Sequence, residues 1–137
     1  MLKLWCLAAT LFLIGCGYTQ PNINEPYGII QPTGGIRILK IDGERVIDLS
    51  GDYILRASPG NHILILAYGH NKKTPVEGSK SPYGKLSVGV EEGICYYIAP
   101  KLKYGLNDLF FGAGFKEVKA WKPFLKEKKE IKGYKKK

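Results

Sequence analysis

Histidine and cysteine are scarce in this sequence, and their scarcity excludes several classes of function. The two histidines, His62 and His70, have no second His, Cys or Glu nearby at the spacing of zinc ligands. Ser87 lacks the glycine spacing of a nucleophile elbow, and residues 112–114 form a lone Gly-x-Gly without a following helix. We therefore expect no catalytic residues, no bound metal and no cofactor, and we interpret both histidines as structural or solvated.

The sequence also lacks any apolar run long enough to cross a bilayer as a helix, which takes about 20 residues. Its most apolar run, residues 4–14, follows the positive charge of Lys3. The run ends on Ile14-Gly15-Cys16, so that a small residue directly precedes a cysteine. A positive start, a short apolar centre and a small residue before the cut are typical of a secretion signal.

The ending Leu13-Ile14-Gly15-Cys16 resembles the lipobox of bacterial lipoproteins. The resemblance implies that the Cys16 thiol takes a diacylglyceryl group and that a signal peptidase cuts between Gly15 and Cys16. Two or more fatty chains, such as palmitate, hold a protein stably at a membrane, whereas one chain does so only marginally. Three alternatives stay open: an uncleaved membrane anchor, an ordinary secretion signal and an apolar start without function.

The lipobox interpretation places the chain in the bacterial cell envelope, anchored through Cys16. Neither Gly17 nor Tyr18 is the aspartate that retains such proteins at an inner membrane, so in a Gram-negative host the resemblance implies the outer membrane, facing the periplasm. Cys6 leaves with the signal and Cys16 carries the lipid, so Cys95 cannot form an internal disulfide. We expect Cys95 to be a small buried residue, and a cross-link to a partner is the alternative.

Positive charge is concentrated at the C-terminus. The formal net charge is +9, yet residues 16–115 contain ten Lys/Arg against nine Asp/Glu, whereas residues 116–137 contain ten lysines against three glutamates. The candidate contacts to an anionic surface are Lys126, Lys128, Lys129, Lys132, Lys135, Lys136 and Lys137. Such a cluster attracts anionic lipids, lipopolysaccharide phosphates or acidic cell-wall polymers, and a merely solvated end is the alternative. Nucleic acid is not an expected partner, because export separates the two and no aromatic residues interleave with the lysines.

Short β-type segments separated by turns fill the rest of the chain, without an apolar stripe at helical period. Asp42-Gly43 predicts a tight hairpin, because a type I′ turn needs positive φ at both central residues, and Pro59-Gly60 predicts another turn. The expected strands cover residues 36–41, 44–47, 53–56, 62–68, 85–90, 94–99 and 115–121. About seven short strands at this spacing predict an all-β fold, a small single-domain β-sandwich or a barrel.

The strand pattern and the charge distribution divide the chain into four parts. We expect Pro100 and Pro123 to end the strands that precede them, and the polar, proline-containing stretch after Cys16 to be a flexible tether. The parts are a signal peptide (1–15), the lipidated cysteine with its tether (16–27), a β-sandwich (28–122) and a basic, disordered tail (123–137).

Three motifs of the expected sandwich resemble a known type of domain. They are Ile41-Asp42-Gly43, Pro59-Gly60-Asn61-His62 and the stretch from Glu92-Gly93 through Tyr96-Tyr97. Together, over roughly residues 34–122, they are similar to the small PEGA-like and other transthyretin-like domains of bacterial envelope lipoproteins. The resemblance implies a β-sandwich that binds or spaces rather than catalyses, and it carries over no catalytic residues.

These observations favour a non-enzymatic, lipid-anchored envelope protein that acts as a structural or protein-binding module. Residues 69–83, residues 100–112 and the tail are the candidate contacts to an envelope protein partner. The alternative is a ligand-binding or adhesion lipoprotein that holds an anionic glycan, lipopolysaccharide or cell-wall polymer through the lysine-rich C-terminus.

Overall fold

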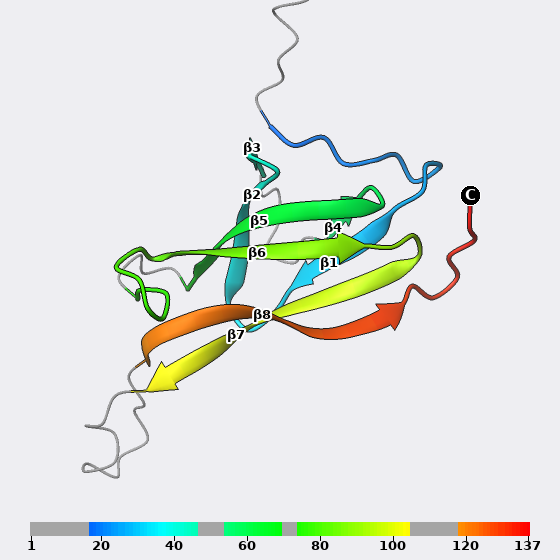
Figure 1. Ribbon diagram of the computed structural model, residues 1–137. Coiled ribbons are helices and arrows are strands. Elements are labelled where there is room, and N and C mark those ends of the chain that lie inside the picture. Colours follow the sequence, from blue (N-terminus) through cyan, green and yellow to red (C-terminus); the bar gives the residue numbers. More distant parts are fainter. Residues whose placement is uncertain (1–16, 47–53, 70–73, 105–117) are drawn as a thin grey trace, which may run out of the picture.

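A computed structural model describes residues 17–46, 54–69, 74–104 and 118–137 of the chain (Figure 1). These residues form eight strands in two four-stranded sheets and include no helix. The first sheet has the strand order β4-β1-β7-β8, and the second sheet has the order β3-β2-β5-β6. The strands are β1 (Gly28–Pro32), β2 (Ile36–Ile41), β3 (Glu44–Arg45), β4 (Leu55–Ala57), β5 (Gly60–Tyr68), β6 (Tyr83–Val90), β7 (Ile94–Tyr104) and β8 (Val118–Glu130). The all-β, single-domain prediction is confirmed.

The hydrophobic core lies between the two sheets and follows the alternation of each strand. In β6, Val88 and Val90 are buried and Leu86 packs against the core, while Lys85 and Ser87 face solvent, as the sequence predicts. Burial of such apolar surface supplies about 25 cal/mol per Å². The largest fully buried side chains are Trp121, Tyr96, Ile30, Ile41, Leu55, Leu64, Leu66 and Ile98.

The hairpin predicted at Asp42-Gly43 is confirmed. Asp42 has φ 51° and Gly43 has φ 81°, and Ile41 of β2 faces Glu44 of β3 in the register. Two positive φ values at the central positions are those of a type I′ turn, whose twist matches that of the paired strands. Glycine and aspartate both tolerate this left-handed conformation, which explains the dipeptide.

The sequence misses β1, although this strand is central to the first sheet. Residues Ile29 to Pro32 pair in parallel with Cys95 to Ile98 of β7, and β1 also pairs antiparallel with β4. Strand β1 is only five residues long, ends in proline and shows little alternation to reveal it. Its position makes Ile30 a fully buried core residue.

The strand ends predicted at Pro100 and Pro123 are wrong. Strand β7 continues through Pro100 to Tyr104, β8 continues through Pro123 to Glu130, and the two prolines face each other in the register. Facing prolines fit a non-hydrogen-bonded pair of an antiparallel ladder, where neither residue donates to the other. Because β8 is an edge strand, the missing N–H of Pro123 leaves no neighbouring strand unpaired.

Residues 123–137 are therefore not the disordered tail that their composition suggests. Residues 123–130 belong to β8, and the end of the chain folds back onto the turn between β6 and β7. The N–H of Ile131 donates to the oxygen of Gly93 at 2.9 Å, and the ring of Tyr134 packs edge-on against Tyr27 with 5.0 Å between centroids. Pairing with β7 and this aromatic contact outweigh the low apolar content of the segment.

The polar stretch after Cys16 is not a free tether in the structure. The N–H of Tyr18 donates to the oxygen of Arg45 at 2.8 Å, and its hydroxyl donates to the oxygen of Arg56 at 2.9 Å. Arg45 lies in β3 at the edge of the second sheet, and Arg56 lies in β4 at the edge of the first. Tyr18 therefore closes the side of the sandwich between these two edges, and Gln20 adds a bond to the N–H of Arg56 at 2.9 Å.

The opposite side of the sandwich is closed by β6 and β8. Gly84 lies so close to β8 that an added Cβ would be 2.9 Å from the ring of Trp121 and 3.1 Å from Pro123. The segment before β6 also pairs with the edge of β8, because Glu77 N–H donates to Trp121 O at 2.8 Å and Trp121 N–H donates to Pro75 O at 3.1 Å. Part of the predicted polar loop 69–83 thus extends the first sheet.

Candidate functional site

The antiparallel pair of β7 and β8, which we call the β7–β8 ribbon, carries five of the ten lysines in residues 116–137. It is paired from Ile94 opposite Glu130 to Tyr104 opposite Val118. The register shifts between Tyr97 and Ile98, which leaves Lys126 as an extra residue on β8. A bulge of this kind bends an edge strand and changes the direction of its side chains.

Two lysines face each other directly on the ribbon. Lys101 of β7 and Lys122 of β8 are cross-strand partners, so both side chains lie on the same face, and both are exposed. Like charges at this position destabilise a sheet.

The facing lysines line a cavity of about 500 Å³ at the corner where the two sheets meet. Lys85 comes from β6 and Glu77 from the segment before it. The Nζ of Lys103 lies 4.0 Å from an oxygen of Glu77, but this exposed pair contributes little stability. The cavity is lined by Val76, Glu77, Lys85, Leu86, Lys101, Lys122 and Pro123, so that three lysines meet a single carboxylate.

Aromatic rings hold the lysines at the other end of the ribbon. The Nζ of Lys128 lies 5.7 Å from the ring centroid of Tyr96, and that of Lys129 lies 5.7 Å from the ring of Tyr97. Each such cation–π contact is worth about 0.5–1 kcal/mol at an exposed site. Lys129 also lies 3.4 Å from Glu127. The aliphatic parts of these lysine side chains therefore lie against the tyrosines, while the ammonium groups stay accessible to an anion.

Glu92 fixes the end of the chain. One carboxylate oxygen accepts the backbone N–H of Lys137 at 2.7 Å and the hydroxyl of Tyr134 at 2.9 Å. The bond from Lys137 is the main cause that holds the pKa of Glu92 below its ordinary value, and burial raises the pKa of Tyr134. The Nζ of Lys137 in turn lies 5.1 Å from the Tyr134 ring centroid.

The structure divides the predicted site residues into three groups. Lys126, Lys128 and Lys129 lie on β8, whereas Gly15 and Cys16 lie outside the described residues. The remaining lysines are exposed on the docked C-terminal segment: Lys132, Lys135, Lys136 and Lys137.

Sequence reasoning missed the lysines at the corner of the sheets. Lys85, Lys101 and Lys122 lie in three separate segments, and only the strand register brings them together. One sequence signal could have revealed the facing lysines. Pro100-Lys101 and Lys122-Pro123 have reversed sequence order, so antiparallel pairing places proline opposite proline and lysine opposite lysine.

Residues with reactive side chains are engaged in the fold. His62 is buried, with Nδ1 2.6 Å from Asp42 Oδ2 and Nε2 2.6 Å from Ser58 O. Cys95 is buried as predicted, and burial raises the pKa of its thiol. Within the described ranges, no group of three or more His, Cys, Asp or Glu side chains is placed to hold a metal ion. His70 lies outside those ranges.

Comparisons with protein-family models, curated proteins and solved structures find no match to this chain. In the part of the chain that the structure describes, no helix has the length and apolar character needed to span a membrane. The function therefore has to be inferred from the residues themselves.

Proposed function

We propose that this protein is a non-enzymatic, lipid-anchored module of the bacterial cell envelope, built on a PEGA-like or transthyretin-like β-sandwich. The ending Leu13-Ile14-Gly15-Cys16 supports an anchor at Cys16. The Asp42-Gly43 and Pro59-Gly60 motifs of the resemblance both lie where a strand of the second sheet ends or begins.

The docking of Tyr18 is the observation that carries this proposal. Tyr18 is bonded to both sheets, and Cys16 precedes it by two residues, a span of about 7 Å at most. Acyl chains on Cys16 would therefore hold the folded body directly at the lipid headgroups instead of on a long tether. The side of the sandwich formed by β3 and β4 would face the membrane.

This orientation leaves the β7–β8 ribbon free for a partner. In Figure 1 the described chain begins near β3, and β8 lies on the other side of the molecule. If the host is Gram-negative, the ribbon of an outer-membrane protein would then face the periplasm. An envelope protein is the first candidate for its partner.

A second candidate partner is an anionic polymer, such as lipopolysaccharide or an acidic cell-wall polymer. The facing pair Lys101–Lys122 favours it, because the pair weakens the sheet and forms, with Lys85, a cavity of positive charge. An anion in that cavity would remove the repulsion between the lysines.

The anchor is tested in cells that express a Cys16→Ser variant. We expect this variant to stay uncleaved at Gly15 and to incorporate no labelled palmitate, whereas the control Cys6→Ser is processed normally because Cys6 leaves with the signal. Mass spectrometry of the native protein showing an unmodified thiol at Cys16 would refute the proposal.

The two partners are distinguished by a double variant, Lys101→Gln with Lys122→Gln. Its affinity for purified lipopolysaccharide and lipoteichoic acid should fall by roughly 30-fold, since each cation near an anionic surface contributes about 1 kcal/mol. The matched control is Lys80→Gln with Lys119→Gln, which removes two exposed lysines that do not line the cavity. Unchanged polymer binding would reject the polymer, and cross-linking in intact cells would then identify the protein partner.

A further inference from the structure

A second basic feature lies on the outer face of the second sheet, away from the ribbon. It is a groove of about 680 Å³. Its lining residues are Arg37, Ile38, Leu39, Lys40, Arg45, Val46, Ile65 and Tyr83. Three of them are cations, none is acidic, and the others give an apolar floor with an aromatic ring at one side. The lining residues that the structure describes therefore combine positive charge with apolar surface.

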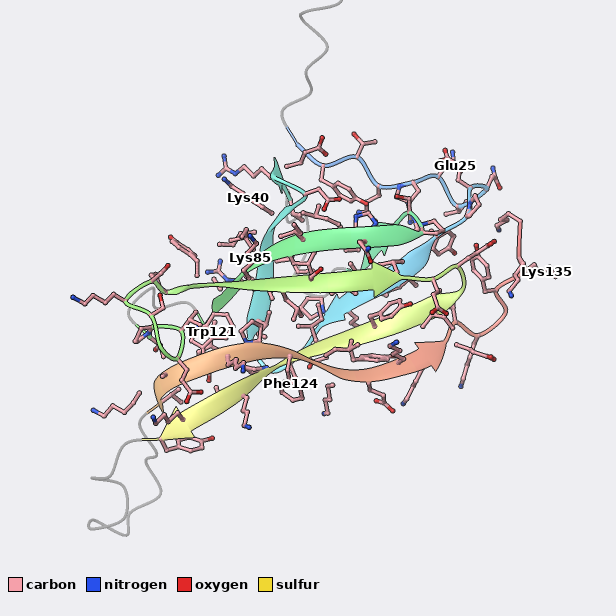
Figure 2. All side chains as sticks on the ribbon, viewed as in Figure 1. Glu25, Lys40, Lys85, Trp121, Phe124 and Lys135 are labelled. Carbon is pink, nitrogen blue, oxygen red and sulfur yellow. The ribbon has the colours of Figure 1, made fainter. Side chains whose placement is uncertain are left out.

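The strand register explains how two of the three cations, Lys40 and Arg45, come together. Arg45 of β3 faces Lys40 of β2, and Lys40 faces Ile65 of β5, which in turn faces Lys85 of β6. A bulge between Ile38 and Lys40 directs Lys40 to the outer face beside Ile65. Figure 2 shows Lys40 and Lys85 on this sheet, and Phe124 on β8 at the other side of the molecule. As on the ribbon, two like charges face each other at the expense of sheet stability.

Arg37 has a buried donor without an acceptor among the residues that the structure describes. Its Nη2 donates to the oxygen of Gly69 at 3.3 Å, while its buried Nε finds no acceptor within the described chain. A buried N–H without an acceptor costs about as much as a lost hydrogen bond. The guanidinium group also brings a permanent positive charge to the groove, which a bound phosphate would neutralise.

The groove adjoins the point where the N-terminus docks. Arg45, whose side chain lines the groove, accepts the N–H of Tyr18 through its backbone oxygen at 2.8 Å. Val46, the next residue of the lining, donates its N–H to Leu39 at 2.9 Å. Cys16 stands two residues before Tyr18, so acyl chains on Cys16 would enter a bilayer next to this face.

We propose that the groove of Arg37, Lys40 and Arg45 binds the phosphate headgroup of an anionic phospholipid in the bilayer that holds Cys16. This inference rests on the proposed lipid anchor. The cations bind the phosphate, and Leu39, Ile65 and Tyr83 contact the glycerol and upper acyl region. The acyl chains on Cys16 would already hold the protein at the membrane, and a basic patch beside them adds attraction to anionic headgroups. The contact sets the orientation in which the ribbon points away from the membrane.

The test uses the mature, lipidated protein in nanodiscs and measures amide hydrogen exchange. One set of discs contains phosphatidylcholine alone, and the other also contains phosphatidylglycerol. We expect residues 36–46 to exchange about fivefold more slowly in the discs that contain phosphatidylglycerol. A single cation near an anionic surface contributes about 1 kcal/mol, which corresponds to about this factor. The double variant Lys40→Gln with Arg45→Gln should return exchange to its phosphatidylcholine rate. This change removes a like-charge pair, so it should not weaken the fold.

The matched control is Lys101→Gln with Lys122→Gln, which removes the facing pair on the ribbon and should keep the protection. Equal exchange in both discs, or protection unaffected by the groove variant, would overturn the inference. Protection by soluble glycerol phosphate in phosphatidylcholine discs would also overturn it, because the ligand would then be a free phosphate ester. A protein that fails to stay on either disc would instead indicate that the lipid anchor itself is wrong.

Discussion

The imidazole of His62 is bonded to the carboxylate of Asp42, with 2.6 Å between Nδ1 and Oδ2. The other oxygen of Asp42 accepts the N–H of Ile63 at 2.8 Å, and Nε2 of His62 lies 2.6 Å from Ser58 O. Both ring nitrogens thus lie within hydrogen-bond distance of an oxygen atom. The pair connects the turn after β2 to the beginning of β5, and it joins two of the sequence motifs that suggest the fold.

The first prediction concerns the pH dependence of this pair. Burial opposes ionisation of Asp42, but hydrogen bonds from Ile63 and His62 outweigh it and lower its pKa. A carboxyl group with a lowered folded-state pKa stabilises the fold above about pH 4, and this contribution is lost as pH falls through the folded-state value. Asp42→Asn, which tolerates the positive φ, should lower the free energy of unfolding by about 1–3 kcal/mol near pH 7.

Urea titrations near pH 7 and below about pH 3 measure this effect. The difference between Asp42→Asn and the wild type should shrink in acid, and the control Glu44→Gln, at an exposed carboxylate, should change little. A stability difference that is the same at both pH values would show that the charge of Asp42 does not matter.

The second prediction concerns the corner between β6 and β8. A Cβ at position 84 would lie 2.9 Å from the buried ring of Trp121, so Gly84→Ala should destabilise the fold by about 1–3 kcal/mol. Gly89→Ala in the same strand is the control, because its Cβ would meet only the side-chain oxygen of Asn61 at 3.2 Å. Once the leader with Trp5 is removed, Trp121 is the one tryptophan, and its fluorescence reports unfolding. Equal midpoints for both variants would contradict the close packing.

Much of the fold was predictable because it depends on local signals. The Asp42-Gly43 turn needs positive φ at two adjacent residues, and the alternation in β6 separates a core face from a solvent face within one strand. Both signals are contained in a few consecutive residues. Strand β5 was equally evident from its continuous run of β-formers.

The remaining features depend on pairing between distant segments. Pro100 and Pro123 are strand breakers when taken alone, and only their mutual register allows β7 and β8 to continue. The composition around Tyr18 suggests a polar tether, and only the folded structure shows that Tyr18 contacts both edges of the sandwich. The corner cavity has the same origin, because its lysines belong to different strands. Single-residue preferences carry no information about such contacts.

The third prediction separates stability from binding on the ribbon. Lys122→Glu replaces a like-charge pair by an opposite-charge pair with Lys101, which should raise the free energy of unfolding by about 0.2–1 kcal/mol. The same change should weaken binding of anionic polymers, and added salt should reduce both effects. Denaturant unfolding and a polymer-binding titration on one protein sample measure them. If stability falls, the two side chains do not face each other as described.

The fourth prediction concerns the C-terminal segment. Deleting residues 123–137 removes eight residues of β8, including Leu125, which packs against the core, and should abolish cooperative unfolding. Deleting only residues 135–137 removes the bond from Lys137 to Glu92 and should leave unfolding cooperative with nearly the same midpoint. Thermal unfolding followed by circular dichroism compares the two. A cooperative transition in the longer deletion would restore the view of this segment as a dispensable tail.

The last prediction concerns Tyr18, which joins the anchor to the fold. Burial, with the nearby carboxylates of Asp42 and Glu44, raises the pKa of its phenol to about 12. Tyr18→Phe removes the bond to Arg56 and should lower the free energy of unfolding by about 0.5–1.5 kcal/mol, whereas Tyr18→Ala also loses packing against the core and should lower it further.

Limited proteolysis measures whether residues 18–21, which connect the anchor to the sandwich, become accessible in Tyr18→Ala. In the wild type, residues 18–21 are held against β3 and β4 and should resist cleavage, and in Tyr18→Ala they should become the first site cut. Cleavage there would release the domain from its lipid while leaving the sandwich intact. If the wild type and Tyr18→Ala are cut at the same rate, the domain hangs from a free tether, and neither the orientation of the ribbon nor the lipid contact of the groove would follow from the anchor.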